Sequence, residues 1–108
     1  MKKIYLFIFI GLISISCDVN HNSDRAQDWG NAVTYSDSKA KEDVERVKDQ
    51  VDVIFVSMHW GTEYSHSANS EQKRIAKYLS ELGVNIIIGT HPHVLEPIEY
   101  INDTLVIY

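Results

Sequence analysis

The sequence has little of several residue types, and each shortage excludes a class of protein. Its 108 residues include one cysteine, Cys17, so neither an intramolecular disulfide nor a cysteine-based zinc site can form. The net charge is −5 and the basic residues are not clustered, which excludes a typical nucleic-acid-binding protein. The longest apolar run, residues 4–15, is too short to span a bilayer as a helix. These shortages leave a small folded domain behind an apolar N-terminal segment.

The N-terminal segment, residues 1–17, predicts a lipoprotein signal peptide. Two lysines precede the apolar run, and residues 14–17 (Ser-Ile-Ser-Cys) resemble the lipobox of bacterial lipoproteins, in which cleavage leaves a lipidated cysteine at the new N-terminus. The lipobox usually has Leu, Val or Ile where this chain has Ser14, so ordinary secretory cleavage is the alternative. Acyl chains on Cys17 would anchor the mature protein to the outer face of a membrane.

The rest of the chain divides into a linker and a domain. Residues 18–32 are polar and predict a flexible linker. Residues 33–108 carry the periodic apolar patterns of one folded domain. Tyr108 ends the chain inside an apolar run with no turn or polar residue after it, which predicts a truncated reading frame or a fragment.

The first half of the domain predicts a helix followed by a strand. Apolar residues recur at helical spacing over residues 38–50, with Asp37 or Ser38 as the N-cap. Residues 51–57 form a β-branched run of the kind found in strands that are buried on both faces.

The second half predicts a helix, a strand and a hairpin. The helix covers residues 70–82, with a serine as its N-cap and Gly83 directly after it, and the strand covers residues 84–88. Strand, helix and strand in this order predict a βαβ unit with parallel strands. Residues 98–101 and 105–108, joined by an Asn-Asp turn, predict a C-terminal β-hairpin. The predicted fold class is α/β.

Three of the five histidines follow the two predicted parallel strands, and this placement predicts a metal site. His59 follows the first strand, while His91 and His93 flank Pro92 after the second. Side chains at i and i+2 point the same way in an extended backbone, so this pair would hold one ion. His59 would add a nitrogen from the neighbouring strand, because ligands collect at the carboxyl ends of parallel strands. The alternative for His59 is a packed, hydrogen-bonded residue without a ligand role.

The chemistry of such a site depends on the ion and on Glu63. Imidazole ligands suit zinc, manganese or iron, which lower the pKa of bound water or polarise a phosphoryl or carbonyl oxygen. Glu63 lies four residues after His59 and is a ligand, a partner of an imidazole or a general base, three roles that the sequence leaves open. The remaining conspicuous residues are expected to be structural or solvated: Trp60 over the core, and His66, Glu96 and Glu99 in solvent.

Two motifs together resemble the bacterial capsule-synthesis CapA family, also called the poly-γ-glutamate biosynthesis protein family. The first is His-Trp-Gly-Thr-Glu at residues 59–63, and the second is Gly-Thr-His-Pro-His at residues 89–93. The family is similar in fold to calcineurin-like metallophosphoesterases, whose β-sandwich flanked by helices binds metals at strand ends. The resemblance therefore implies a partial metallophosphoesterase-like fold over residues 33–108.

The resemblance also implies a site and a setting. It makes His59, His91 and His93 metal ligands and gives Glu63 and His59 the catalytic roles. The implied cofactor is a divalent Mn, Fe or Zn ion, with two ions in a complete protein that acts as a metal-dependent hydrolase or phosphoesterase. The implied partners are an anionic surface polymer, such as poly-γ-glutamate or capsule polysaccharide, and membrane proteins of capsule synthesis. Members are extracytoplasmic and membrane-attached.

The chain departs from the family pattern in two respects: it ends at Tyr108, where family members continue, and it lacks two of their segments. Family members carry a Gly-Asp segment and an Asn-His segment that supply the remaining metal ligands, and this sequence has no counterpart of either. Two alternatives to an enzyme therefore stay open: a non-enzymatic surface lipoprotein that binds metal or polymer, and an inactive gene fragment.

Overall fold

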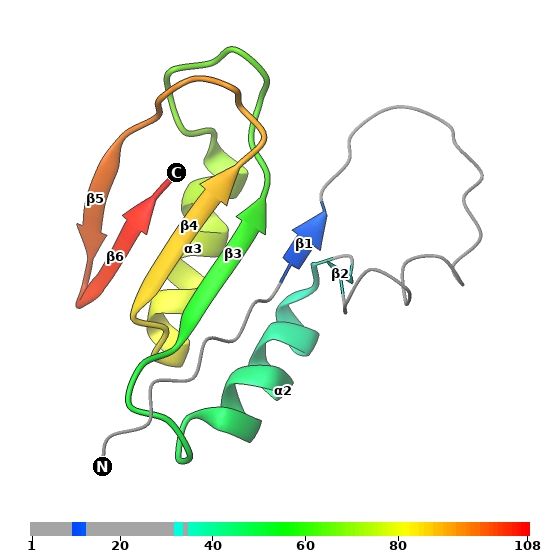
Figure 1. Cartoon of the computed structure of the whole chain (residues 1–108), viewed down its shortest axis with the longest axis vertical. Helices are drawn as coiled ribbons and strands as arrows, with labels where there is room; N and C mark the ends of the chain where they lie inside the picture. The colour runs from blue at the N-terminus through cyan, green and yellow to red at the C-terminus, as the bar shows by residue number, and fades with distance from the viewer. Residues whose placement is uncertain (1–9, 13–31, 34) are drawn as a thin grey trace, which may run out of the picture.

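The structure, a computed structural model, describes residues 10–12, 32–33 and 35–108. Six strands form one sheet in the order β2-β1-β3-β4-β6-β5, with two helices packed against it (Figure 1). The predicted α/β class is confirmed. The described residues form this one sheet and no second one, so the metallophosphoesterase-like sandwich stays a prediction. Neither helix of the described ranges has the length and apolar character needed to cross a membrane.

Helix α2 spans Asp37–Val47, so it begins one residue before the predicted helix of residues 38–50 and ends three residues before the predicted end. Ser36 has an extended backbone, with φ −144°, and its side-chain oxygen accepts a hydrogen bond from the backbone N–H of Lys39 at 3.2 Å. The prediction of Asp37 or Ser38 as the N-cap is therefore wrong. The Asp37 carboxylate instead accepts hydrogen bonds from Tyr35 and Arg74.

Strand β3 spans Phe55–His59, later than the predicted residues 51–57. The backbone N–H of Ile54 donates to the side-chain oxygen of Asn85 at 2.7 Å, so a side chain satisfies the backbone just before the strand begins. The strand also ends two residues later than predicted, so His59 is its last residue rather than a residue of the following loop.

Helix α3 spans Ser70–Leu82, as predicted, and ends at Gly83, whose φ of 96° lies in the left-handed region that favours glycine. Its N-cap is Asn69 rather than a serine. The Asn69 side chain accepts from the backbone N–H of Gln72 at 2.9 Å, and the Gln72 side chain accepts from the backbone N–H of Asn69 at 2.8 Å. This reciprocal pair is a capping box, which satisfies two N–H groups at the start of the helix.

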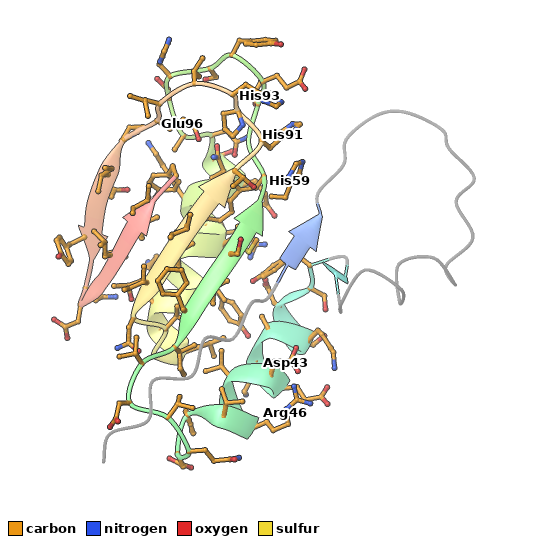
Figure 2. The ribbon with its side chains drawn as sticks, in the orientation of Figure 1. Asp43, Arg46, His59, His91, His93 and Glu96 are labelled. Carbon is orange, nitrogen blue, oxygen red and sulfur yellow. The ribbon has the colours of Figure 1, made fainter. Side chains whose placement is uncertain are left out.

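Strand β4 spans Ile86–Thr90, β5 spans Ile98–Ile101 and β6 spans Thr104–Ile107. β3 and β4 are parallel and are joined through α3, and β5 and β6 are antiparallel, so the predicted βαβ unit and hairpin are confirmed. His59 lies opposite Thr90 in the register. The carboxyl ends of the two strands, and the histidines there, therefore meet at one edge of the sheet (Figure 2).

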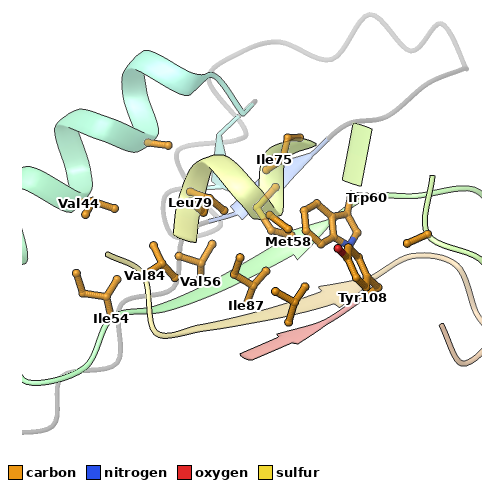
Figure 3. Packing of buried hydrophobic residues seen from close by; sticks show 14 residues of the cluster. Val44, Ile54, Val56, Met58, Trp60, Ile75, Leu79, Val84, Ile87 and Tyr108 are labelled. Atoms are coloured by element: carbon orange, nitrogen blue, oxygen red, sulfur yellow. The ribbon is translucent and has the colours of Figure 1, made fainter. Parts of the chain in front are cut away.

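One face of the sheet packs against the helices and forms the core. Val44 of α2 and Leu79 of α3 pack with Met58 of β3 and Ile87 of β4, all buried (Figure 3). Burying an aliphatic side chain of this size contributes about 1.5–3 kcal/mol. The side chains that alternate with these along β3, β4 and β6 point to the opposite face and are half-buried: Phe55, Ile86, Ile88, Leu105 and Ile107.

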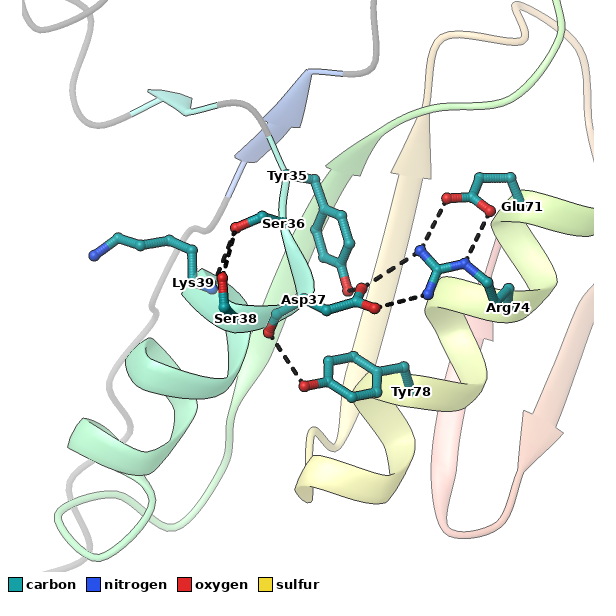
Figure 4. Close-up of polar contacts among 8 residues, drawn as sticks. All are labelled: Tyr35, Ser36, Asp37, Ser38, Lys39, Glu71, Arg74 and Tyr78. Atoms are coloured by element: carbon teal, nitrogen blue, oxygen red, sulfur yellow. Dashed lines mark hydrogen bonds and ion pairs between the residues drawn. The ribbon is translucent and has the colours of Figure 1, made fainter.

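A polar cluster connects the two helices. The guanidinium of Arg74 in α3 donates to Asp37 at 2.9 Å and to Glu71 at 2.9 Å, and the hydroxyl of Tyr35 donates to Asp37 at 2.7 Å (Figure 4). The Arg74 hydrogen bond holds the pKa of Asp37 below its ordinary value. Burial and the neighbouring Asp37 raise the pKa of Tyr35, which therefore remains a hydrogen-bond donor at neutral pH.

The N-terminal strands, β1 and β2, lie on the side of β3 that is away from β4. β1 spans Ile10–Leu12 and runs parallel to β3, and β2 spans Ala32–Val33 and pairs with β1. Residues 10–12 belong to the predicted signal peptide. The rest of that segment, Cys17 and the predicted linker up to Ala32 lie outside the described residues, so the signal peptide, the lipidation and the linker stay predictions.

Candidate metal centre

The three predicted histidines lie together where β3 and β4 end. His59 is the last residue of β3, and its ring centroid lies 4.6 Å from that of His91, the first residue after β4. The ring of His93 follows at 5.9 Å from that of His91 (Figure 2). His59 and His91, 32 positions apart in the sequence, are neighbours here because the parallel strands end at the same level.

The donor atoms that approach most closely belong to Glu63, His91 and His93. One ligand atom of each residue lies within 4.8 Å of the others, and the Glu63 carboxylate is 3.7 Å from the Nε2 atom of His93. Two imidazole nitrogens and one carboxylate oxygen form a donor set that fits zinc, manganese or iron. His59 is not a member of this group, although its ring lies next to that of His91. The arrangement favours the ligand or imidazole-partner role for Glu63.

The backbone that carries the His-Pro-His motif is not extended. His91 has φ 105° and His93 has φ 61°, so the expectation of an extended pair is wrong, although the two rings still approach one another. Between these two residues, the carbonyl of Pro92 accepts a hydrogen bond from the backbone N–H of Tyr64 at 2.8 Å. Positive φ at residues other than glycine is strained, and such strain is concentrated at functional sites.

The surroundings favour an uncharged His59. Burial lowers the pKa of His59, and the nearby His91 and His93 lower it further because positive charges repel one another. The hydroxyl of Thr90 donates to the carbonyl of Met58 at 3.1 Å and lies 3.5 Å from Nδ1 of His59. A neutral imidazole is the form that binds a metal ion or accepts a proton. The lowered pKa of His59 favours this form.

Two loops carry the site: the first loop, residues 60–69, follows β3, and the second loop, residues 91–97, follows β4. The backbone N–H of Trp60 donates to the carbonyl of Thr90, at the end of β4, at 3.0 Å. The first loop also bonds to the second loop, from Tyr64 N to Pro92 O at 2.8 Å and from the His66 ring to Leu95 O at 3.0 Å. The expected exposure of His66 is confirmed, and its ring bonds to the second loop from outside the metal group.

Among the residues expected to be structural, one is wrongly predicted. Trp60 is buried and stacks on Tyr108, as expected, and Glu99 is exposed. Glu96 is 8% exposed rather than solvated, because the second loop turns it inward to accept a hydrogen bond from Gln72 at 2.7 Å. Gln72 is a buried polar residue that the sequence motifs do not single out. The spacing Asn-x-x-Gln before an apolar stripe is the signal that identifies it as a capping residue.

An open cavity of about 380 Å³ adjoins the histidines. Its lining comes mainly from the second loop and the end of β4, with Tyr108 on one side. His91 and His93 both line this cavity and can be reached from solvent through it.

An α/β sheet with histidines and a carboxylate at the ends of adjacent parallel strands defines a class of candidate metal-binding proteins. The chain belongs to the family described as bacterial capsule synthesis protein PGA_cap, whose model matches residues 11–108. The match begins ahead of the predicted domain boundary at residue 33, and the predicted resemblance to CapA proteins is confirmed.

Two curated relatives are similar to about two thirds of the chain. The PGA biosynthesis protein CapA of Bacillus subtilis (strain 168) is 43% identical over 65 residues, which are 60% of this chain and 17% of the relative. The capsule biosynthesis protein CapA of Bacillus anthracis is 35% identical over 71 residues, 66% of this chain and 16% of the relative. The matched region is thus about one sixth of each relative's length. No solved structure gives a significant match.

Proposed function

We propose that this chain is part of a metal-dependent protein of capsule or poly-γ-glutamate synthesis, anchored at the outer face of a bacterial membrane through Cys17. Family membership and the names of its two relatives support the biosynthetic role. The observation that carries the metal role is the convergence of Glu63, His91 and His93 at the ends of adjacent parallel strands.

Each residue of the site has a distinct part in this proposal. His91 and His93 would hold the ion, and Glu63 would balance its charge and orient the ring of His93, 3.7 Å away. His59, whose pKa is lowered, would add a nitrogen or accept a proton from a reacting group. A bound divalent ion supplies Lewis-acid activation of a phosphoryl or carbonyl oxygen, or of water. The proposed reaction is metal-assisted hydrolysis or transfer at a phosphoryl or amide-type centre.

The proposed partner is an anionic surface polymer, with membrane proteins of capsule synthesis as further partners. A chain of net charge −5 repels such a polymer on average. A cation held by Glu63, His91 and His93 would reverse the local potential at the cavity, where a carboxylate or phosphate group of the polymer would approach.

Metal titration tests the site directly. Isothermal titration calorimetry of the full chain with Zn²⁺ and with Mn²⁺ is expected to show binding that weakens about tenfold or more in a variant with both His91→Ala and His93→Ala. Asp103→Ala is the control, because this carboxylate is exposed in the turn between β5 and β6, outside the metal group, and the variant is expected to bind like the unmodified chain. Equal affinity in the double variant would contradict a metal role for this motif.

A second candidate function is metal or polymer binding without catalysis. It is favoured by the single carboxylate in the metal group of the described residues, because two-metal phosphoesterase sites need more anionic ligands. The two functions are separated by hydrolysis of a chromogenic phosphodiester by the metal-loaded chain. Metal binding without hydrolysis supports the binder, and hydrolysis that persists in His59→Ala contradicts the catalytic role of His59.

A further inference from the structure

A buried hydrogen bond connects α3 to the second loop, which carries two of the candidate metal ligands. The side-chain amide of Gln72 in α3 donates to the Glu96 carboxyl group at 2.7 Å, across 24 positions of sequence. Both side chains are buried, with 1% and 8% exposed. Within the part of the chain that the structure describes, it is the one buried hydrogen bond between two side chains.

Gln72 uses both ends of its amide, and each end serves a different loop. Its oxygen accepts from the backbone N–H of Asn69, which fixes the end of the first loop to the start of α3. Its nitrogen donates to Glu96, which fixes the end of the second loop. One side chain thus sets the distance between the segments that present Glu63 and His93.

The Gln72 amide also lies directly against both metal-site motifs. A Cβ atom placed on Gly61, of the His-Trp-Gly motif, would lie 2.7 Å from the Gln72 amide nitrogen and 3.1 Å from Cγ of Pro92, of the His-Pro-His motif. These distances leave no room for a loop to shift toward the amide. The three groups form a packed contact beneath the candidate ligands.

Stability alone does not account for this pair. Burying a carboxyl group is costly unless its oxygens are hydrogen-bonded, and Oε1 of Glu96 has no partner among the described residues. Buried polar groups that are incompletely satisfied are uncommon and call for an explanation beyond packing. A role in holding the loop geometry provides one.

We propose that Gln72 and Glu96 are positioning residues of the metal site, which keep Glu63 within reach of His91 and His93. The inference rests on the proposed metal-binding function. It names no ligand to the ion and no catalytic role for either residue. It predicts that metal affinity follows the geometry of this hydrogen bond and not the number of negative charges near the ion.

Exchanging the donor and the acceptor tests the proposal. In Gln72→Glu two carboxyl groups face each other, while the capping box remains because Glu also serves at that position. This variant is expected to bind Zn²⁺ or Mn²⁺ about tenfold more weakly, although an added negative charge alone would strengthen cation binding. The exchanged pair, Gln72→Glu with Glu96→Gln, restores one donor, one acceptor and the original net charge. Its affinity is expected to return to within about threefold of the unmodified chain.

A control separates positioning from stability. The hydroxyl of Thr104 is buried and donates to the carbonyl of Val84 at 2.6 Å, away from the metal site. Thr104→Val is expected to lower the melting temperature and leave metal affinity unchanged. If Gln72→Glu behaves in the same way, or if the exchanged pair does not regain affinity, the proposal is overturned. Should Gln72→Glu fail to fold, Glu96→Met removes the acceptor at similar length and carries the same expectation.

A second measurement needs no metal. Hydrogen exchange at the amide of Tyr64, which donates to Pro92 across the two loops, is expected to accelerate in Gln72→Glu and to slow again in the exchanged pair. If the unmodified chain binds no metal, the proposed function fails, while this measurement still decides whether the pair positions the loops. Unchanged exchange in all variants would contradict the positioning role.

Discussion

Gly61 occupies a position where both the backbone and the available space exclude a side chain. Its φ is +91°, and an added Cβ would meet the Gln72 amide and the Pro92 ring. Gly83, at the end of α3, has a similar φ of +96° with nothing within 4 Å of the added atom. Substitutions at these two glycines therefore distinguish the cost of backbone strain, which both share, from the cost of steric overlap, which only Gly61 has.

The two alanine substitutions are expected to differ in cost. Gly83→Ala places a Cβ in the left-handed region and is expected to lower the free energy of unfolding by about 1 kcal/mol. Gly61→Ala adds overlap to the same strain and is expected to lower it by about 2–4 kcal/mol. Urea denaturation of both variants measures the difference. Equal losses would show that the first loop moves away from Gln72 without cost.

Patterns in the sequence predicted which residues would lie together at the strand ends better than they predicted the geometry of these residues. The strand-end positions and the motif spacing led to His59, Glu63, His91 and His93, which the structure brings together. The positive φ angles of the second loop were not predictable, because they depend on hydrogen bonds to the first loop. Glu96 was assigned to solvent for a related reason: an acidic residue is buried only where a distant partner meets it.

At the scale of the elements, apolar periodicity predicted the helices more accurately than the strands. α3 begins and ends where its pattern and Gly83 indicate. The start of β3 differs because the Asn85 side chain takes the N–H of Ile54, a contact between segments 31 positions apart that no local pattern contains. β1 lies in a segment whose composition also fits a signal peptide, so composition alone did not predict its pairing with β3.

The contact between α2 and α3 is expected to depend on pH. Because Arg74 lowers the pKa of Asp37 in the folded protein, the unfolded chain binds more protons between the folded pKa and the ordinary value of 3.8. The stabilisation is therefore complete above about pH 4 and is lost as the pH falls through the lower, folded pKa. Asp37→Asn is expected to be less stable than the unmodified chain at pH 6 and to lose less stability on acidification.

Thermal melts between pH 2 and pH 6 test this expectation. Asp52→Asn is the control, since this aspartate is exposed and forms no ion pair among the described residues. The difference between Asp37→Asn and the unmodified chain is also expected to shrink at high salt, because Asp37 and Arg74 are both partly exposed. Parallel pH curves for the two proteins would contradict the assignment.

At the scale of the whole molecule, the two faces of the sheet are unequal. Ile87 points to the helices and is fully buried, whereas its neighbour Ile88 points to the opposite face and is half-buried beside Ile107. Ile87→Ala is expected to cost about 2–5 kcal/mol, and Ile88→Ala roughly half as much or less. Chemical denaturation measures both. Equal costs would mean that the second face is covered in solution.

Because β3 and β4 pair in parallel, binding of a metal ion would be coupled to folding of the chain. His59 and His91 become neighbours only after the chain has crossed over through α3 and closed the intervening loop. The unfolded chain holds these donors apart, so an ion that requires them selects the native state and stabilises it by mass action, by about 2.7 kcal/mol at a free concentration one hundred times Kd. The concentration of available metal would then set what fraction of the chain is folded, as well as what it does.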